Sequence, residues 1–432
     1  MTRSKLTPSV TLPLPLALLA LALGACGTAP PPEPAPDWAG ICGRHCAGEP
    51  AQVRVGAHQV CLRYAGGAVL CWGEVRGRTD DVDPHLVTTE VDGHVLEHDD
   101  AARATALVDG LLDANDLTCG DSFCCAIRGD HSLACWGMLD RWDAPGRGAA
   151  SGDPRLPAAV PGVDDATAFI GRGHAQLALS ALDQDMLALG ARVSRSPPSD
   201  WPYAPVTSVA YSDDGPTMVA DGKVYALCFS GAPGRCGLEF EQDEVFPEFM
   251  LPISGLDDVV SVASRDDTRC ALRASGEVWC WGAARVIWEQ TEHGDHESPR
   301  ASRPTRVDAL SDITVLKASD HGFCALRADH QLLCWGVDTS RILRTGHDDG
   351  ERWQPYLLPD AADVVDFDLN DAALCVIREG ADVACSDLLP PDVPRHGRHR
   401  GQLVRVPGLP ELPADFADEP TGDVSAVDAG AI

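Results

Sequence analysis

A cysteine followed ten positions later by a second cysteine recurs five times along this chain of 432 residues. In most copies the second cysteine runs directly into Trp-Gly. The residues between Cys270 and Cys280 are apolar, then polar, then apolar again, which is the pattern of a β-hairpin. The five pairs are Cys61/Cys71, Cys125/Cys135, Cys270/Cys280, Cys324/Cys334 and Cys375/Cys385.

The spacing also predicts a disulfide across each hairpin. Folding Cys270 onto Cys280 leaves a three-residue loop that ends at Gly276, where such loops need a left-handed backbone. Counting outward from the loop places the two cysteines in a non-hydrogen-bonded pair, whose side chains approach closely enough for a disulfide. The equivalent loop position is occupied by Gly67, His131 and His330, and histidine is enriched among non-glycine residues with positive φ.

The first residues predict export. Arg3 and Lys5 precede an apolar run over residues 12–23 that is too short to span a bilayer. The tetrad that ends at Cys26 resembles the bacterial lipobox, in which the cysteine is lipidated and becomes the mature N-terminus. An ordinary secretory signal cleaved nearby is the alternative, and both lead to a compartment where disulfides persist.

The lipobox interpretation gives a domain plan and a location. It predicts a signal peptide over residues 1–25, a lipidated Cys26 with a Pro-rich tether over 26–50, a folded domain over 51–410 and an acidic disordered tail over 411–432. The protein then lies in a bacterial cell envelope, at the outer membrane or cell surface. It contacts the membrane through its lipid anchor only.

The remaining cysteines are read as structural. Setting Cys26 aside leaves 16 of the 17 cysteines, an even number. Cys228 and Cys236 are predicted to close a local loop. Four others are left open between local and crossed pairing: Cys42, Cys46, Cys119 and Cys124.

Charge excludes one class of partner. The chain has 65 Asp and Glu against 34 Lys and Arg, with a formal net charge of −31. Such a surface repels nucleic acid and anionic lipid and favours solubility, so nucleic-acid binding is set aside. We expect a monomer.

Aligning the chain on the first hairpin cysteine exposes a longer repeat. A Val-x-Gly-Leu type segment lies upstream, followed by an acid twelve positions before the cysteine and an apolar residue eight positions before it. The unit is interpreted as four short strands, or one blade of a β-propeller. Two units lack cysteines but keep the pattern, so seven units are counted. Their anchors are Cys61, Cys125, Leu177, Pro216, Cys270, Cys324 and Cys375.

The expected fold is therefore an all-β, seven-bladed β-propeller. The first unit lacks its leading strand, and a matching segment appears near the other end of the chain, over residues 403–409. We expect this C-terminal strand to join the first blade and close the ring, which leaves no long open sheet edge.

The repeats resemble those of the regulator-of-chromosome-condensation family. The resemblance rests on the Cys-Ala-Leu…Gly-x-Val-x-Cys-Trp-Gly stretches, best seen at residues 270–282 and 324–336, and covers about residues 51–410. It implies a seven-bladed propeller but not a specific function, and the Gly-Gln-Leu-Gly stretch that many members carry is absent. The eukaryotic member's nucleotide exchange is not transferred, because it acts on a nuclear GTPase.

No sequence motif indicates catalysis. The chain has no His-Glu-x-x-His motif, phosphate-binding Gly-rich loop or Gly-x-Ser-x-Gly elbow. The run from Glu292 to His296 contains metal-ligand types, but its interpretation is a solvated loop, so neither a metal nor a cofactor is predicted. Trp142, Trp288 and Trp353 lie in long connections and are candidates for partner contact, since interfaces are enriched in Trp.

The sequence thus predicts a surface-anchored, non-enzymatic propeller that presents inter-blade loops to a protein partner. Two alternatives stay open. One is an exported hydrolase or lyase acting on polysaccharide in the central funnel, and the other is a purely structural envelope protein. Converging carboxylates or histidines at the funnel would favour the enzyme, whereas long loops with aromatic residues favour binding.

Overall fold

The computed structural model divides the chain into two compact units, residues 1–36 and 37–432. All described residues belong to the second unit. They are 37–56, 59–73, 89–91, 94–96, 105–108, 110–120, 123–137, 157–172, 177–181, 186–189, 193–195, 205–211, 215–226, 251–265, 268–282, 301–319, 322–336, 352–358, 360–370, 373–386 and 403–411. The predicted signal peptide, Cys26, the Cys228/Cys236 pair, Trp142 and Trp288 lie outside them. None of the described helices is long and apolar enough to cross a membrane.

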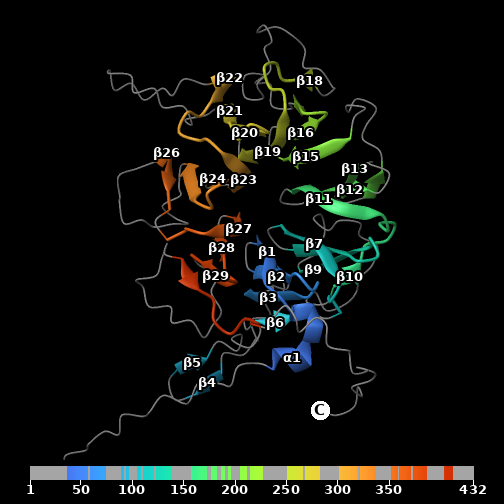
Figure 1. The fold of residues 1–432 in the computed structure, drawn as a ribbon. Helices are drawn as coiled ribbons and strands as arrows, with labels where there is room; N and C mark the ends of the chain where they lie inside the picture. Colours follow the sequence, from blue (N-terminus) through green and yellow to red (C-terminus); the bar gives the residue numbers. More distant parts are fainter. Residues whose placement is uncertain are drawn as a thin grey trace, which may run out of the picture. The chain divides into compact units, whose positions relative to one another are not determined.

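The described strands form antiparallel sheets that follow one another around a common centre (Figure 1). The first sheet is β1 (Pro50–Val55), β2 (Gln59–Tyr64), β3 (Val69–Gly73) and β6 (Ala106–Leu107). The second is β7 (Ala114–Cys119), β8 (Phe123–Arg128), β9 (Leu133–Gly137) and β10 (Ala158–Ala159). The short β4 (Thr89–Val91) and β5 (His94–Leu96) pair separately.

Three further four-stranded sheets come from the second half of the chain. They are β19 (Val259–Arg265), β20 (Thr268–Arg273), β21 (Val278–Gly282) and β22 (Ala301–Arg306); β23 (Ile313–Ser319), β24 (Gly322–Arg327), β25 (Leu332–Gly336) and β26 (Arg352–Leu357); and β27 (Val364–Leu369), β28 (Leu374–Arg378), β29 (Asp382–Cys385) and β30 (Val404–Arg405). In each sheet, the first strand of the sequence is an edge strand and the hairpin lies beside it.

The middle of the chain forms one sheet of eight strands. It contains β11 (Ala166–Arg172), β12 (Leu177–Ala181), β13 (Met186–Leu189), β14 (Val193–Arg195), β15 (Val206–Ala210), β16 (Thr217–Ala220), β17 (Lys223–Ala226) and β18 (Leu251–Pro252). The two units without cysteines are joined here, because β11 and β15 pair in parallel at Gly171 with Val209 and Arg172 with Ala210.

The expectation of seven blades is therefore wrong, because the described residues form six blade sheets, five of four strands and one of eight. The physical reason lies at Gly171. A Cβ atom there would lie 2.3 Å from the carbonyl oxygen of Val209. Without a side chain, the two backbones approach closely enough to hydrogen-bond, and two sequence units merge into one sheet.

The hairpins have the register that the spacing predicts. Cys270 faces Cys280 and Leu272 faces Val278, and Gly276 has a φ of 81°. Gly67, His131 and His330 also have positive φ. The two units without cysteines are exceptions, because Thr217 rather than Pro216 faces Ala226 and Leu177 faces Leu189 rather than the predicted Ala188.

Seven disulfides lie among the described residues. Five cross the hairpins, and the four cysteines left open by the sequence pair locally. The bonds are Cys42–Cys46, Cys61–Cys71, Cys119–Cys124, Cys125–Cys135, Cys270–Cys280, Cys324–Cys334 and Cys375–Cys385.

Adjacent units are joined by a repeated backbone bond. Most units have an acid twelve positions before their anchor residue, and the backbone N–H of the residue after that acid donates to the carbonyl of the left-handed loop residue of the preceding unit. Examples are Ile313 N–H to the carbonyl of Gly276 (3.1 Å) and Val364 N–H to the carbonyl of His330 (3.0 Å). The same bond joins Gly67 to Ala114, His131 to Ala166 and Gly222 to Val259. In the first unit this position is Pro50, which has no N–H, so the junction between last and first sheets must be held differently.

The predicted C-terminal closure is also wrong in its pairing. Strand β30 pairs with β29, with Val404 facing Cys385, and so completes the last sheet rather than the first. The reason is the phase of the repeat. The first segment of each sequence unit hydrogen-bonds to the preceding sheet, as Val108 does to Val69 and Val406 to Val383. The first strand of a sequence unit is therefore the last strand of the preceding sheet.

The ring closes instead through packing and the N-terminal neck. Val406 and Leu409 pack in one core cluster with Val53 and Leu62 of the first sheet. Helix α1 (Trp38–Ile41) and the 3-10 helix η1 (Gly43–Cys46) cover this junction, and Trp38 Nε1 donates to the carbonyl of Gly408 at 2.9 Å. Elsewhere the core lies between sheets, with the Cys-Trp-Gly tryptophans fully buried: Trp72, Trp136, Trp281 and Trp335.

Candidate functional site: a charged network on the central cavity

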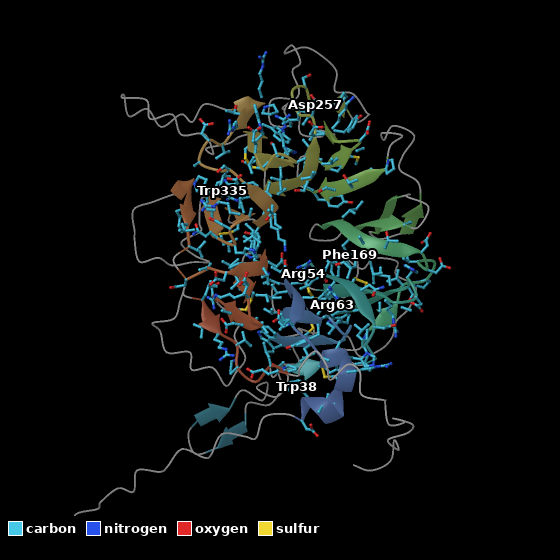
Figure 2. All side chains as sticks on the ribbon, in the orientation of Figure 1. Trp38, Arg54, Arg63, Phe169, Asp257 and Trp335 are labelled. Atoms are coloured by element: carbon cyan, nitrogen blue, oxygen red, sulfur yellow. A yellow bond between two sulfur atoms is a disulfide. The ribbon has the colours of Figure 1, made fainter. Side chains whose placement is uncertain are left out.

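The first strands of the sequence units surround a cavity of about 280 Å³. Strands β1, β7, β11, β15, β19, β23 and β27 all contribute to its wall, and Arg54 and Phe169 lie near the centre in Figure 2. Strands β11, β15 and β19 supply mostly small and apolar residues, among them Gly171, Ala210 and Ala263. The charged residues come from β1, β7, β23 and β27.

One repeat position explains why acids stand here. In two units, the residue nine positions before the first hairpin cysteine is an aspartate that accepts a backbone N–H from the next inner strand. Asp116 accepts from Phe169 at 2.8 Å, and Asp366 accepts from Val53 at 2.9 Å. Ser208 holds the corresponding place on β15 and accepts from Val262 at 3.2 Å. These side chains therefore join inner strands that belong to different units.

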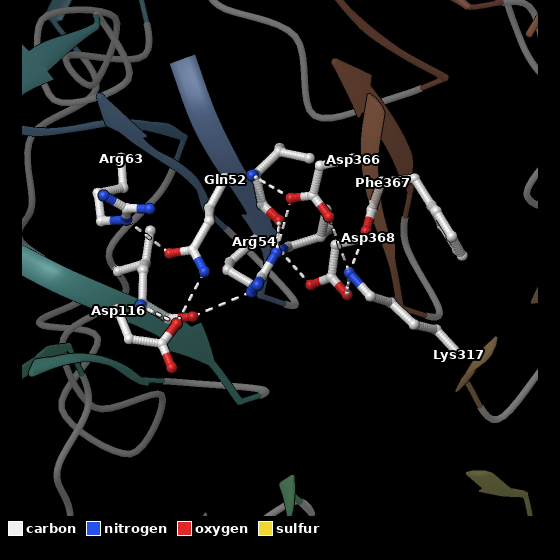
Figure 3. A network of polar contacts seen from close by, with 11 residues as sticks. Gln52, Arg54, Arg63, Asp116, Lys317, Asp366, Phe367 and Asp368 are labelled. Carbon is white, nitrogen blue, oxygen red and sulfur yellow. Dashed lines mark hydrogen bonds and ion pairs between the residues drawn. The ribbon is translucent and has the colours of Figure 1, made fainter. Parts of the chain in front are cut away.

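Arg54 links the first sheet to both of its neighbours. Its Nη1 donates to Asp366 at 2.8 Å and to the carbonyl of Val53 at 2.7 Å, and its Nε donates to the carbonyl of Leu117 at 2.9 Å (Figure 3). Burial alone lowers the pKa of the Arg54 guanidinium, but the fields of Asp366, Asp368 and Asp116 outweigh it and raise that pKa. The side chain therefore stays charged within the junction.

Lys317 is the second cation and reaches from β23 to β27. Its ammonium lies 3.4 Å from Asp366 and 3.7 Å from Asp368, and it donates to the carbonyl of Phe367. It also lies 4.9 Å from the centre of the Phe367 ring, within cation–π range. Asp368 in turn accepts the backbone N–H of Val55 at 2.9 Å, so the network bridges three inner strands.

Arg63 and Gln52 extend the network toward the second sheet. Arg63 Nε donates to Gln52 Oε1 at 2.7 Å, and Gln52 Nε2 donates to Asp116 Oδ1 at 2.8 Å (Figure 3). Burial lowers the pKa of Arg63, and Asp116 offsets part of this effect. Arg63 thus positions Gln52 for its bond to Asp116.

The carboxylates of this network are already bonded to backbone amides and cations. Asp366 is bound by the Val53 amide and Arg54 at one oxygen and by Lys317 at the other. A glycosidase needs two carboxylates that act on substrate as acid and base or nucleophile. Carboxylates that already bond backbone amides and cations serve first to hold strands together, so the site favours a structural role for the charged wall.

The described part of the chain places none of the candidate residues from the sequence in this site. Trp142 and Trp288 lie outside the described residues, and so does the run from Glu292 to His296. Trp353 belongs to strand β26 rather than to a long connection, which corrects its assignment to a loop. Among the described residues, one group of three possible metal ligands lies within 4.8 Å, the sulfur atoms of Cys61, Cys119 and Cys124, and all three are in disulfides.

The sequence contains a signal for the network. Arg54, Lys317 and Asp368 each stand seven positions before the first hairpin cysteine, where other units have small or uncharged residues. A charge at an inward position of a repeat indicates a partner across the ring. Only the ring places Asp366 beside Arg54, 312 residues away in the chain.

Comparisons with known proteins identify similar folds but no family. No family model and no curated protein matches the chain. Yeast RCC1 (Prp20), solved bound to Kap60, is 15% identical with a TM-score of 0.39, covering 77% of this chain and 68% of that one. The family named from the repeat residues is therefore represented among the similar structures.

Two other similar solved structures come from different organisms. PorZ of Porphyromonas gingivalis, a surface component of the type-IX secretion system, is 13% identical with a TM-score of 0.47, covering 80% of this chain and 37% of that one. The CRINKLY WD40 ectodomain of the Arabidopsis thaliana receptor kinase ACR4 is 13% identical with a TM-score of 0.42, covering 77% and 93%. At these values the likenesses carry no argument about function.

Proposed function

We propose that this protein is an exported, non-enzymatic scaffold that binds a protein partner through the surface of a disulfide-linked propeller. The supporting observation is that the charged side chains of the cavity wall are bonded within the protein. Arg54, Lys317 and Asp366 bond to one another or to backbone groups of neighbouring inner strands. The charges of the cavity wall therefore stabilise the propeller, and the outer surface binds the partner.

The scaffold holds its surface rigidly. Five hairpins carry a disulfide, and the repeated backbone bond joins each loop to the next unit. A preorganised surface loses little conformational entropy on binding, which favours affinity for a partner. The disulfides also support an exported location.

Exposed valines mark one candidate contact surface. Val260 on β19 and Val365 on β27 are 48% and 43% exposed, and Thr314 has the same repeat position on the intervening β23. Each is the extra residue of a β-bulge, which turns its side chain out of the ladder. We call these three residues the bulge surface. The two valines lie on alternate inner strands of one face, and we take this face as a candidate for partner contact.

A pull-down with matched variants tests the proposal. The mature protein is incubated with an envelope extract of the source bacterium, beside a Val260→Thr/Val365→Thr variant and a Trp142→Ala/Trp288→Ala variant. Threonine is suitable because Thr314 occupies the equivalent position. A partner lost with the first variant assigns the bulge surface, and a partner lost with the second assigns the loops. Failure to capture a partner contradicts the scaffold, and identical partners in all samples exclude both the bulge surface and the Trp142 and Trp288 loops as the contact.

The anchoring part of the proposal has its own test. Lipidation at Cys26 would hold the protein in the membrane fraction and incorporate a labelled fatty acid. A Cys26→Ser variant should lose the label and leave the membrane fraction. A label retained in that variant contradicts lipidation at this residue.

An exported hydrolase or lyase acting on polysaccharide is the second candidate. One observation favours it, the presence of Asp116 and Asp368 in the wall of the cavity. Turnover of a polysaccharide that disappears in an Asp368→Asn variant of unchanged fold would establish it. The scaffold proposal expects no turnover by either protein.

A further inference from the structure

Two disulfides of neighbouring sheets touch each other. Cys61–Cys71 joins β2 to β3, and Cys119–Cys124 joins β7 to β8. The sulfur of Cys61 lies 3.7 Å from the sulfur of Cys124, and the sulfurs of Cys61, Cys119 and Cys124 all lie within 4.8 Å of one another. Closing the 3.7 Å contact to a disulfide of about 2.05 Å requires a shift of less than about 2 Å.

The vicinal cysteines on β8 explain why this contact exists. Successive strand residues point to opposite faces, so Cys124 and Cys125 enter different cores. Cys125 packs in the cluster with Phe123 and Ile127, whereas Cys124 packs with Cys61 in the cluster between the first two sheets. The additional cysteine one position before the hairpin cysteine thus places a second disulfide against the first.

Cys71 offers an entry from solvent. Of the fourteen half-cystines in the described part of the chain, Cys71 alone is partly exposed, and the other thirteen are buried. Its partner Cys61 is fully buried and is the sulfur that touches Cys124. The partly exposed half-cystine is therefore connected, through one bond and one contact, to a buried disulfide of the next sheet.

We propose that these four cysteines form a thiol–disulfide exchange site, in which a small thiol becomes attached to Cys71 and the first two sheets become covalently linked. The thiolate attacks the sulfur of Cys71, and Cys61 leaves as a thiolate. Released from Cys71, the Cys61 side chain can rotate and attack the sulfur of Cys124. Cys119 then leaves as a thiolate and takes up the proton that the small thiol lost.

The exchange is balanced without an oxidant or a reductant. Two disulfides and one small thiol give a mixed disulfide at Cys71, a Cys61–Cys124 bond and a free thiol at Cys119. Both original disulfides lie within a sheet, whereas the new bond joins two sheets. The class of ligand is a low-molecular-weight thiol such as glutathione.

A cysteine substitution tests the internal step without an added thiol. In a Cys71→Ser variant, Cys61 begins with a free thiol beside Cys124. In the matched Cys280→Ser variant, Cys270 also loses its hairpin partner, but the described residues place no second disulfide in contact with its sulfur. Free thiols are alkylated, the denatured protein is cleaved at low pH, where exchange stops, and linked peptides are identified by mass. Cleavage after Phe123 separates Cys119 from Cys124.

The result expected for Cys71→Ser is an alkylated Cys119 and a linked Cys61–Cys124 peptide, whereas Cys280→Ser should be alkylated at Cys270. An alkylated Cys61 with an intact Cys119–Cys124 bond overturns the proposal. If the Cys71→Ser variant does not fold, folded wild-type protein is incubated with glutathione and mapped in the same way. The expected products are glutathione at Cys71 and a Cys61–Cys124 peptide, and glutathione at Cys71 without that peptide overturns the proposal.

Discussion

Asp366 should contribute more to stability than an ordinary ion-paired acid, because it joins the last sheet to the first. In Asp366→Ala, the N–H of Val53 loses its acceptor, which costs about 1.5–3 kcal/mol for a charged acceptor. Arg54 loses its closest carboxylate, and because the two side chains are 16% and 18% exposed, the cost stays below the roughly 3–5 kcal/mol of a fully buried pair. The terms overlap, and Lys317 keeps Asp368, so we expect a total of about 3 kcal/mol.

Urea unfolding followed by tryptophan fluorescence measures this loss. The matched control is Asp308→Ala, which removes a carboxylate 92% exposed from its pair with Arg306 and should cost less than about 0.5 kcal/mol. Asp366→Asn should fall between them, because its amide oxygen still accepts the Val53 N–H. Hydrogen exchange at residues 50–55 should accelerate on the order of 100-fold in Asp366→Ala.

Two results would refute the reasoning about Asp366. Equal losses in Asp366→Ala and Asp308→Ala would mean that the junction does not depend on this carboxylate. Faster exchange spread evenly over the described strands, rather than at residues 50–55, would mean that the whole ring opens together.

Three further predictions concern single residues. Gly171→Ala should cost about 2 kcal/mol or more because its Cβ would clash with the backbone of β15, whereas Gly129→Ala, with its nearest contact at 3.6 Å, should cost much less; equal melting temperatures would contradict this. Burial raises the pKa of Tyr211 to about 12, so the stability that its neutral phenol contributes is complete below about pH 10 and is lost as the pH rises toward 12. Tyr211→Phe should remove this loss and reduce the late part of the tyrosinate absorbance titration, to which the buried Tyr64 also contributes. His330 has a φ of 65° and its Nδ1 lies 3.1 Å from the carbonyl of Val364, so His330→Gly should cost about 1 kcal/mol and His330→Ala about 1 kcal/mol more, and the reverse order in urea unfolding would exclude the explanation.

The hairpins show how far local spacing can be trusted. The register of Cys270 with Cys280 and the left-handed Gly276 follow from loop length and from the alternation of hydrogen-bonded pairs. These interactions join residues ten positions apart or fewer, so the sequence of one unit contains everything that determines them. The same holds for the disulfides that cross the hairpins.

The site could not be found in this way. Asp366 and Arg54 belong to opposite ends of the chain and meet only when the last sheet lies against the first. The charges at the inward position of β1, β23 and β27 were visible in the repeat, but their partners were not. The Cys61–Cys124 contact has the same origin, since it requires two sheets to pack.

The sequence by itself determined an all-β propeller built from repeated hairpins, because short-range backbone geometry sets each unit. Tertiary structure decided the number of sheets, through the missing side chain of Gly171, and the partner of the C-terminal strand. Both depend on which backbones come within hydrogen-bonding distance after packing. A repeat pattern describes one unit at a time, whereas the closure of the ring depends on residues from both ends of the chain.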